Sequence, residues 1–128
     1  MENHDKIVYP ELSYLIVGVM FDVYKELGGD LQEKHYQRAL SSEFKNRKIK
    51  FSEQVKVPLI YKEQKIGYYA LDFLIEDKIA IEIKKDNNFS PRNIRQLYSY
   101  LKSLNLKLGI LANFTKQGLK FKRVLNIL

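Results

Sequence analysis

Residues 69–84 read YALDFLIEDKIAIEIK, and this stretch decides the fold. Two apolar runs, each short enough to be a strand, flank a polar turn at residues 76–78, a pattern typical of an antiparallel hairpin. Asp72 lies in the first run, and Glu82 and Lys84 lie in the second. A charge inside an apolar strand is costly unless it is paired or binds a metal, so these three residues are the first candidates for a functional site.

Strand geometry is expected to bring these side chains together. Residues two apart on a strand point to the same face, so Glu82 and Lys84 project together while Ile81 and Ile83 pack on the other face. The short turn lets Asp72 lie beside Glu82. Two converging carboxylates suit Mg²⁺ or Mn²⁺, which binds one or two carboxylates, a backbone carbonyl and several waters. A nearby lysine can hold or activate the attacking water, or neutralise charge that develops on a phosphate.

The rest of the chain carries helix and strand signals on both sides of this hairpin. Apolar residues at helical spacing predict helices over residues 11–27, 31–47 and 91–104. Apolar residues with β propensity favour strands over residues 51–61, 66–75, 79–84 and 106–114. Gly28-Gly29 ends the first helix, and Ser90-Pro91 supplies a cap and a first-turn proline for the third. Residues 120–124 fit either a short edge strand or a helix.

The order ααβββαβ predicts an α/β sandwich around a mixed central sheet. The first three strands should form an antiparallel meander, and the crossover helix should make strands 79–84 and 106–114 parallel. The strand at 106–114 is apolar on both faces, which is typical of a central strand. We expect a mobile segment over residues 1–10 and a single domain over residues 11–128.

The composition excludes several classes of site. The 128 residues include no cysteine, which rules out a disulfide framework, a thiol nucleophile and a thiolate zinc site. The same absence fits a reducing cytoplasm, which is the location we expect. The polar start lacks the apolar core of a signal peptide. The longest apolar run, residues 15–21, has seven residues, whereas a bilayer span takes about 20.

The net charge of +7 is unevenly distributed. Residues 1–83 have a balance of −2, whereas residues 84–128 have a balance of +9. Concentrated positive charge suits a polyanion such as nucleic acid, although a solubilising surface would also explain it. Lys85, Arg92 and Arg95 flank the candidate site in the sequence, so we predict that they contact phosphates.

The acids and the lysine resemble the motif of the PD-(D/E)xK nuclease superfamily. That superfamily has an acid on one hairpin strand and an acid-x-lysine on the next, matched here by Asp72 and by Glu82 with Lys84. Its proline position is Leu71 in this chain. Gln96 and Tyr100, one turn apart on the predicted third helix, look like the Gln-x-x-x-Tyr motif of RecB-like nucleases, whose residues help to position substrate.

Residues 30–36, DLQEKHY, resemble the signature of the GxxExxY family within the same superfamily. Glu33 and Tyr36 fit that signature, and the overall likeness covers about residues 11–126. The resemblance implies a restriction-endonuclease-like core and metal-dependent hydrolysis of phosphodiester bonds. Asp72, Glu82 and the Ile83 carbonyl would bind Mg²⁺ or Mn²⁺, and Glu33 would complete the shell directly or through water.

Simpler interpretations stay open for several of these residues. Glu33 could instead form a capping box with Asp30, and Tyr36 is expected in the core. Tyr100 could also be a core residue, and the charged set could be an ion-pair cluster, although stability alone is a poor reason to keep one. The favoured function is a metal-dependent nuclease acting on nucleic acid, with DNA preferred and a homodimer expected. The alternative is a non-catalytic module that binds nucleic acid or a protein and retains the nuclease fold.

Overall fold

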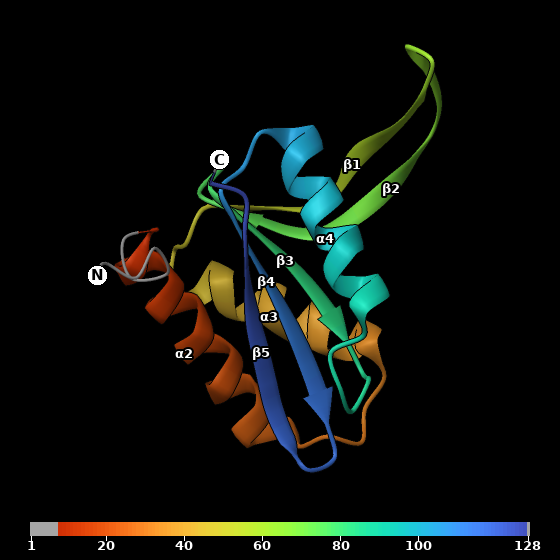
Figure 1. The fold of residues 1–128 in the computed structure, drawn as a ribbon. Coiled ribbons are helices and arrows are strands. Elements are labelled where there is room, and N and C mark those ends of the chain that lie inside the picture. The colour runs from red at the N-terminus through yellow and green to blue at the C-terminus, as the bar shows by residue number, and fades with distance from the viewer. Residues whose placement is uncertain (1–7, 128) are drawn as a thin grey trace, which may run out of the picture.

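The computed structural model describes residues 8–127, and its elements form a sheet between two layers of helix (Figure 1). The helices of this part of the chain are α2 (Pro10–Leu27), α3 (Glu33–Asn46) and α4 (Pro91–Leu104). The strands form one sheet and are β1 (Phe51–Tyr61), β2 (Gln64–Ile75), β3 (Ile79–Lys84), β4 (Leu108–Thr115) and β5 (Gly118–Leu125). α2 and α3 cover one face of the sheet and α4 covers the other (Figure 1).

The strands are ordered β1-β2-β3-β4-β5 across the sheet. β3 and β4 are parallel and the other neighbouring pairs are antiparallel, so the predicted meander, crossover and mixed sheet are confirmed. Every residue of β4 is buried, as expected for a central strand. β5 resolves the alternatives for residues 120–124 in favour of an edge strand and extends the order to ααβββαββ.

The predicted helix ends at Gly28 and Ser90 are confirmed. Gly28 follows α2 with a φ of 71°, a left-handed conformation in which glycine carries no Cβ penalty. Ser90 caps α4, and its Oγ accepts a hydrogen bond from the Asn93 backbone N–H at 3.4 Å. Gly29 is required for a different reason, because a Cβ there would lie 2.2 Å from the Thr115 carbonyl oxygen.

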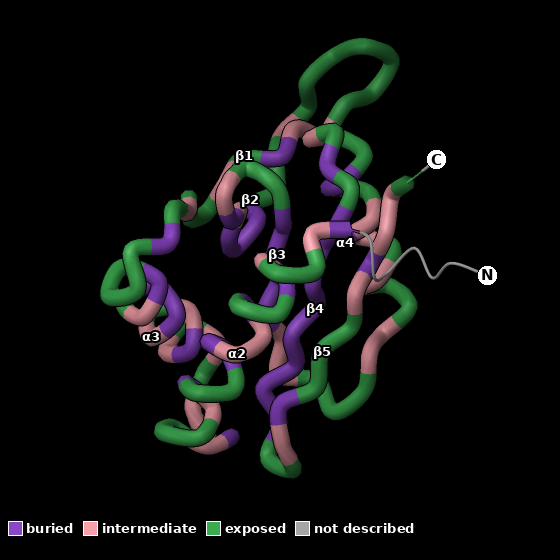
Figure 2. The backbone as a smooth tube through the Cα atoms, turned by 90° about the vertical axis from the view of Figure 1, so that its left-hand side faces the viewer, coloured by how far each residue is buried: buried purple, intermediate pink, exposed green. Residues whose placement is uncertain are grey.

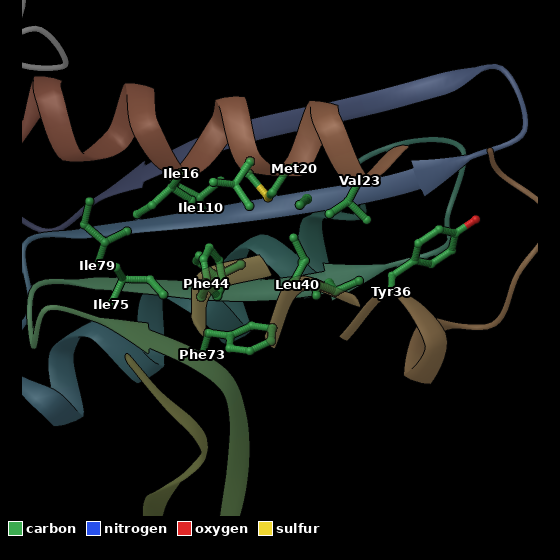
Figure 3. Packing of buried hydrophobic residues seen from close by; sticks show 14 of the residues in the cluster. Ile16, Met20, Val23, Tyr36, Leu40, Phe44, Phe73, Ile75, Ile79 and Ile110 are labelled. Atoms are coloured by element: carbon green, nitrogen blue, oxygen red, sulfur yellow. The ribbon is translucent and has the colours of Figure 1, made fainter. Parts of the chain in front are cut away.

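Two apolar layers hold the sheet in place. The larger layer lies between the sheet and the pair α2 and α3, where Ile16, Met20 and Phe44 meet Ile79 and other strand residues (Figure 3). The smaller layer lies under α4, whose inner face meets β1, β3 and β4. Figure 2 shows buried backbone through the sheet, whereas the far end of the β1–β2 hairpin is exposed.

The predicted mobile N-terminal segment falls mostly on residues 1–7, which lie outside the described residues. Of the remaining three residues, Val8 is buried in the larger apolar layer, Tyr9 precedes α2 and Pro10 begins that helix. Within residues 8–127, no helix is long and apolar enough to cross a membrane.

Candidate metal and catalytic site

The two candidate acids lie where β2 separates from β3. The backbone pairing between these strands runs from Ile75 opposite Ile79 to Phe73 opposite Ile81 and then stops. Beyond that point, the carboxylates of Asp72 and Glu82 accept hydrogen bonds from backbone N–H groups of the neighbouring strand, in place of backbone carbonyls. The Asp72 backbone N–H donates to Glu82 Oε1 at 2.9 Å, and the Ile83 backbone N–H donates to Asp72 Oδ2 at 2.8 Å. These reciprocal hydrogen bonds fix both carboxylates at the point of separation.

Gln54 explains why the strands turn at this point. It lies on β1 between the residues that pair with Phe73 and Leu71, and its side chain forms a hydrogen bond with Asp72. Its φ of 48° is a left-handed value that is unfavourable for a residue with a Cβ. The side chains of β2 switch from one face of the sheet to the other at this point. Phe73 packs under α2 and α3, whereas Leu71 packs under α4. Regular alternation would put both residues on one face. A local irregularity that re-aims side chains is common beside functional sites.

Burial of the two acids makes their ionisation unfavourable. Asp72 is 8% exposed and Glu82 is 7% exposed. Burial raises the pKa of Glu82 to about 8, and the neighbouring Asp72 charge adds to that rise. Burial also raises the pKa of Asp72, against the hydrogen bond from Ile83 and the positive charge of Lys84. A bound cation would compensate the cost of ionising these two buried carboxyl groups.

Lys84 lies at the end of β3, two residues beyond Glu82. Its charge lowers the pKa of both acids, which places it in their electrostatic neighbourhood. No hydrogen bond or ion pair engages its ammonium group among residues 8–127. The alternative interpretation as an ion-pair cluster is therefore not supported by a direct contact of Lys84, and its ammonium has its donors available.

The α3 start departs from the predicted cap. Gln32, and not Asp30, is the N-cap, and its side chain and that of His35 form the capping box. The His35 Nδ1 accepts from the Gln32 backbone N–H at 3.3 Å. The predicted box between Asp30 and Glu33 is wrong because the helix begins at Glu33. Glu33 is thus not engaged as a cap.

Glu33 lies within electrostatic range of the two acids but does not join them in one cluster. Burial raises its pKa, and the charges of Lys84 and Asp72 act on it in opposite directions. Within the described part of the chain, no three His, Cys, Asp or Glu side chains lie close enough together to form a metal site. A role for Glu33 as a metal ligand, directly or through water, stays a prediction.

Gln37 is a site residue that the sequence analysis missed. It lies one turn after Glu33 on α3, and its Nε2 donates to Asp72 Oδ1 at 2.9 Å. The Asp72 carboxylate therefore has one oxygen fixed by Gln37 and the other by Ile83. The signal was present as a polar pair at i and i+4, because such a pair lies on one helix face.

α4 brings Tyr100 toward the acids. Tyr100 is buried in the smaller apolar layer, and its ring centroid lies 5.6 Å from that of Tyr69 on β2. Burial raises the pKa of Tyr100, and the charge of Glu82 raises it further. Tyr100 is thus both a core residue and a neighbour of the site. Gln96 lies one turn earlier and is half-buried, and its predicted substrate contact stays a prediction.

Tyr36 and Lys85 form a structural unit beside the site. Tyr36 is fully buried, as expected, stacks on Phe114 at 4.5 Å and donates its hydroxyl to the Gly28 carbonyl at 2.5 Å. The Lys85 ammonium donates to the Gly29 carbonyl at 2.5 Å and lies 5.3 Å from the Tyr36 ring centroid. Lys85 therefore joins the α2–α3 loop to the sheet, and its predicted phosphate contact would use its remaining donors.

The loop between β3 and α4 is fixed by a second missed residue, Asn113. This residue lies opposite Lys84 on β4, and its Nδ2 donates to the carbonyl oxygens of Asp86 at 3.0 Å and Asn88 at 3.1 Å. The loop leads into α4, where Arg92 and Arg95 are exposed near the start. Their phosphate contacts stay predictions, now placed on the helix that carries Tyr100.

The donor set fits a hard divalent cation. The two buried carboxylates lie close enough to affect each other's pKa, and Lys84 supplies positive charge beside them. The backbone of Ile83 is hydrogen-bonded to Asp72, so its carbonyl is a further oxygen near the two acids. Oxygen ligands of this kind are preferred by Mg²⁺ and Mn²⁺.

The mixed sheet between helical layers has the restriction-endonuclease-like fold. A sequence model of the PD-(D/E)XK nuclease superfamily matches residues 10–124, and the chain belongs to that superfamily. The crystal structure of SSO0001 is similar in fold, with a TM-score of 0.58 and 18% sequence identity. That match covers 96% of this chain and 60% of the SSO0001 chain, so this chain spans less than two thirds of the length of SSO0001. A search of curated proteins finds no match.

Proposed function

We propose that this protein is a divalent-metal-dependent nuclease that hydrolyses phosphodiester bonds, with DNA as the preferred substrate and Mg²⁺ or Mn²⁺ as the cofactor. The observation that carries the proposal is the pair of buried carboxylates beside Lys84, each of which accepts a hydrogen bond from a backbone N–H of the other strand. Membership of a nuclease superfamily supports the same activity. The more specific assignments to the GxxExxY family, a cytoplasmic location and a homodimer are part of this proposal.

Each residue of the site has a distinct task in the proposed reaction. Asp72, Glu82 and the Ile83 carbonyl would hold the cation, and Gln37 keeps the Asp72 carboxylate in place. When bound, the cation would lower the pKa of a coordinated water and polarise the phosphate. Lys84 positions the attacking water or neutralises charge on the phosphate. Gln96 and Tyr100 orient the substrate strand, and Lys85, Arg92 and Arg95 hold its backbone.

A cleavage assay on the Lys84→Ala variant tests this function. The substrates are labelled single-stranded, duplex and branched DNA together with RNA, each with Mg²⁺ or Mn²⁺. We expect Lys84→Ala to lower the cleavage rate by roughly 10²–10⁴-fold, the usual contribution of a positioned catalytic group. A thermal melt close to that of the wild type would show that the fold is intact, because Lys84 makes no direct polar contact within residues 8–127.

Lys107→Ala is the matched control. Lys107 is exposed just before β4, at the opposite end of the parallel β3–β4 pair from Lys84, and the substitution removes the same charge. It should cleave like the wild type. Unchanged cleavage by Lys84→Ala would contradict the assignment, and binding without turnover by the wild-type protein would favour the non-catalytic nucleic-acid-binding alternative.

A further inference from the structure

The far end of the β1–β2 hairpin extends beyond the body of the protein as an arm, defined here as residues 57–69 (Figure 1). Its strands stay paired as far as Tyr61 opposite Gln64 and are joined by a tight turn at Lys62-Glu63. Both turn residues have positive φ, 47° and 68°, which matches the twist of a paired hairpin. The arm is therefore a preformed ribbon whose tip does not pack on the rest of the protein (Figure 2).

The arm exposes an unusual number of large apolar side chains. Tyr61 and Tyr68 are 59% and 51% exposed, and Tyr69 is 43% exposed at the base. Two lysines lie over the outer rings. The Lys62 ammonium is 5.4 Å from the Tyr61 ring centroid, and the Lys56 ammonium is 4.8 Å from that of Tyr68. Exposed aromatic surface concentrated on one projection is typical of a binding site.

The tyrosines lie on opposite faces of the arm. Tyr69 is paired with Val57, which packs under α4, so their shared face is the one that meets α4. The register shift beside Leu59 leaves an extra residue, Ile66, on β2, so alternation continues along β1 and puts Tyr61 on the same face as Val57. Tyr68, next to Tyr69, lies on the other face. The Tyr69 ring contacts Tyr100, whose pKa responds to the charge of Glu82. One face of the arm is thus continuous with the candidate site.

The chemistry of this face favours an unpaired nucleic-acid strand. Exposed aromatic rings stack on unpaired bases, and adjacent lysines neutralise the backbone, whereas the bases of a duplex are already stacked on each other. The arm contains Lys62, Lys65 and one acid, Glu63, a balance of +1, so a second copy of the arm would bring like charges together. A polyanion matches this charge and a like-charged arm does not.

We propose that the Tyr61–Tyr69 face of the arm binds an unpaired nucleic-acid strand by base stacking and leads it past Tyr100 to the acids. This inference rests on the proposed nuclease function, because it names the form of substrate that reaches the site. The arm binds bases without regard to their identity, since every base has a face that can stack.

Fluorescence anisotropy with EDTA present tests the proposal without cleavage. The probes are a labelled thymidine oligonucleotide of about 15 residues, an abasic oligonucleotide of the same length, a uridine oligonucleotide and a blunt duplex. Wild-type protein should bind the thymidine probe roughly tenfold or more tightly than the abasic probe. Tyr61→Ala should bind the thymidine probe about tenfold more weakly than the wild type. Tyr61→Phe, which keeps the ring, should bind it like the wild type. The uridine probe shows whether RNA is bound in the same way.

Tyr68→Ala is the matched control, because Tyr68 is equally exposed on the same arm but lies on its other face. It should bind the thymidine probe like the wild type. Equal losses in Tyr61→Ala and Tyr68→Ala would overturn the proposed face, and no loss in Tyr61→Ala would overturn the proposal. A changed oligomeric state of Tyr61→Ala in light scattering, with unchanged oligonucleotide binding, would instead identify a protein interface and overturn it.

The test also separates this inference from the nuclease proposal. Lys107→Ala should keep the Tyr61-dependent binding, since Lys107 belongs to neither the arm nor the candidate site. Tyr61-dependent binding in a protein that cleaves none of the substrates would leave the arm proposal standing and remove the nuclease. Cleavage by Tyr61→Ala with wild-type oligonucleotide binding would do the reverse.

Discussion

The two sides of β3 differ in chemistry, although both belong to one short strand: one side is apolar and the other carries charge. Ile79, Ile81 and Ile83 are fully buried against α2 and α3, in the larger apolar layer. The other side carries Glu82 and Lys84, and the Glu82 carboxyl is buried at a cost shown by its raised pKa. The first side contributes burial free energy and the second holds charge that stability alone does not explain. Stability measurements should therefore detect one side, and activity measurements the other.

Ile81→Ala should give the largest effect on stability. Truncating a fully buried isoleucine costs about 2–5 kcal/mol in the free energy of unfolding, because it removes apolar contacts and leaves a cavity. Denaturant unfolding of this variant measures the loss, and Lys84→Ala provides the comparison three residues along the chain. We expect Lys84→Ala to unfold within about 0.5 kcal/mol of the wild type. Similar losses in both variants would contradict the division between the two sides.

Gln37→Ala should give an intermediate effect, on the site and not on the fold. Gln37 holds one oxygen of Asp72, and loss of a residue that orients a metal ligand costs about 10–100-fold in affinity or activity. Isothermal titration calorimetry with Mn²⁺ measures the change in metal affinity. Gln32→Ala is a control, because it alters the cap of the same helix without touching Asp72. Equal Mn²⁺ affinity in Gln37→Ala and the wild type would remove Gln37 from the site.

The pH dependence of stability should reveal the cost of burying Glu82. The folded-state pKa of Glu82 is about 8, above its ordinary value of 4.5, so the folded protein takes up a proton that the unfolded chain releases. The free energy of unfolding of the metal-free protein should therefore rise as the pH falls from about 8 toward 4.5. Asp72 acts in the same direction, because its pKa is also raised.

Melting temperatures measured in EDTA across this pH range check the effect. Glu82→Gln keeps an oxygen that can accept the hydrogen bond from the Asp72 backbone N–H but cannot ionise, so its melting temperature should depend less on pH. The other titrating groups are common to both proteins and cancel in the comparison. Parallel pH curves for Glu82→Gln and the wild type would show that Glu82 carries no such penalty.

The central elements could be predicted because their signals are local. The apolar runs that flank the turn at residues 76–78 predicted the hairpin, and the helix that follows predicted the parallel pairing of β3 with β4. The charges inside those runs predicted that Asp72 and Glu82 would lie together, which the hydrogen bonds confirm. Alternation predicted that Glu82 and Lys84 would lie on one side of β3. Burial of Ile81 and Ile83 in the apolar layer under α2 and α3, on the other side, agrees with this prediction.

The remaining features depend on tertiary structure and were not accessible from local patterns. Alternation fails at Gln54, whose left-handed backbone allows Leu71 and Phe73 to pack on opposite faces. The cap at Asp30 was wrong because the α2–α3 loop is fixed by Tyr36 and Lys85, which delays the helix by two residues. The role of Gln37 required the distance between α3 and β2, which no sequence pattern supplies.

The proposed nuclease function depends on a divalent-cation site at the point where β2 separates from β3. A crystal of the wild-type protein soaked with Mn²⁺ tests it most directly through the anomalous density of the metal. We expect a peak about 2.1 Å from carboxylate oxygens of both Asp72 and Glu82, with Lys84 adjacent. The same soak of Glu82→Gln crystals should lose that peak. Metal density only at another place, or no density between Asp72 and Glu82 in the wild type, would contradict a cation site at this point.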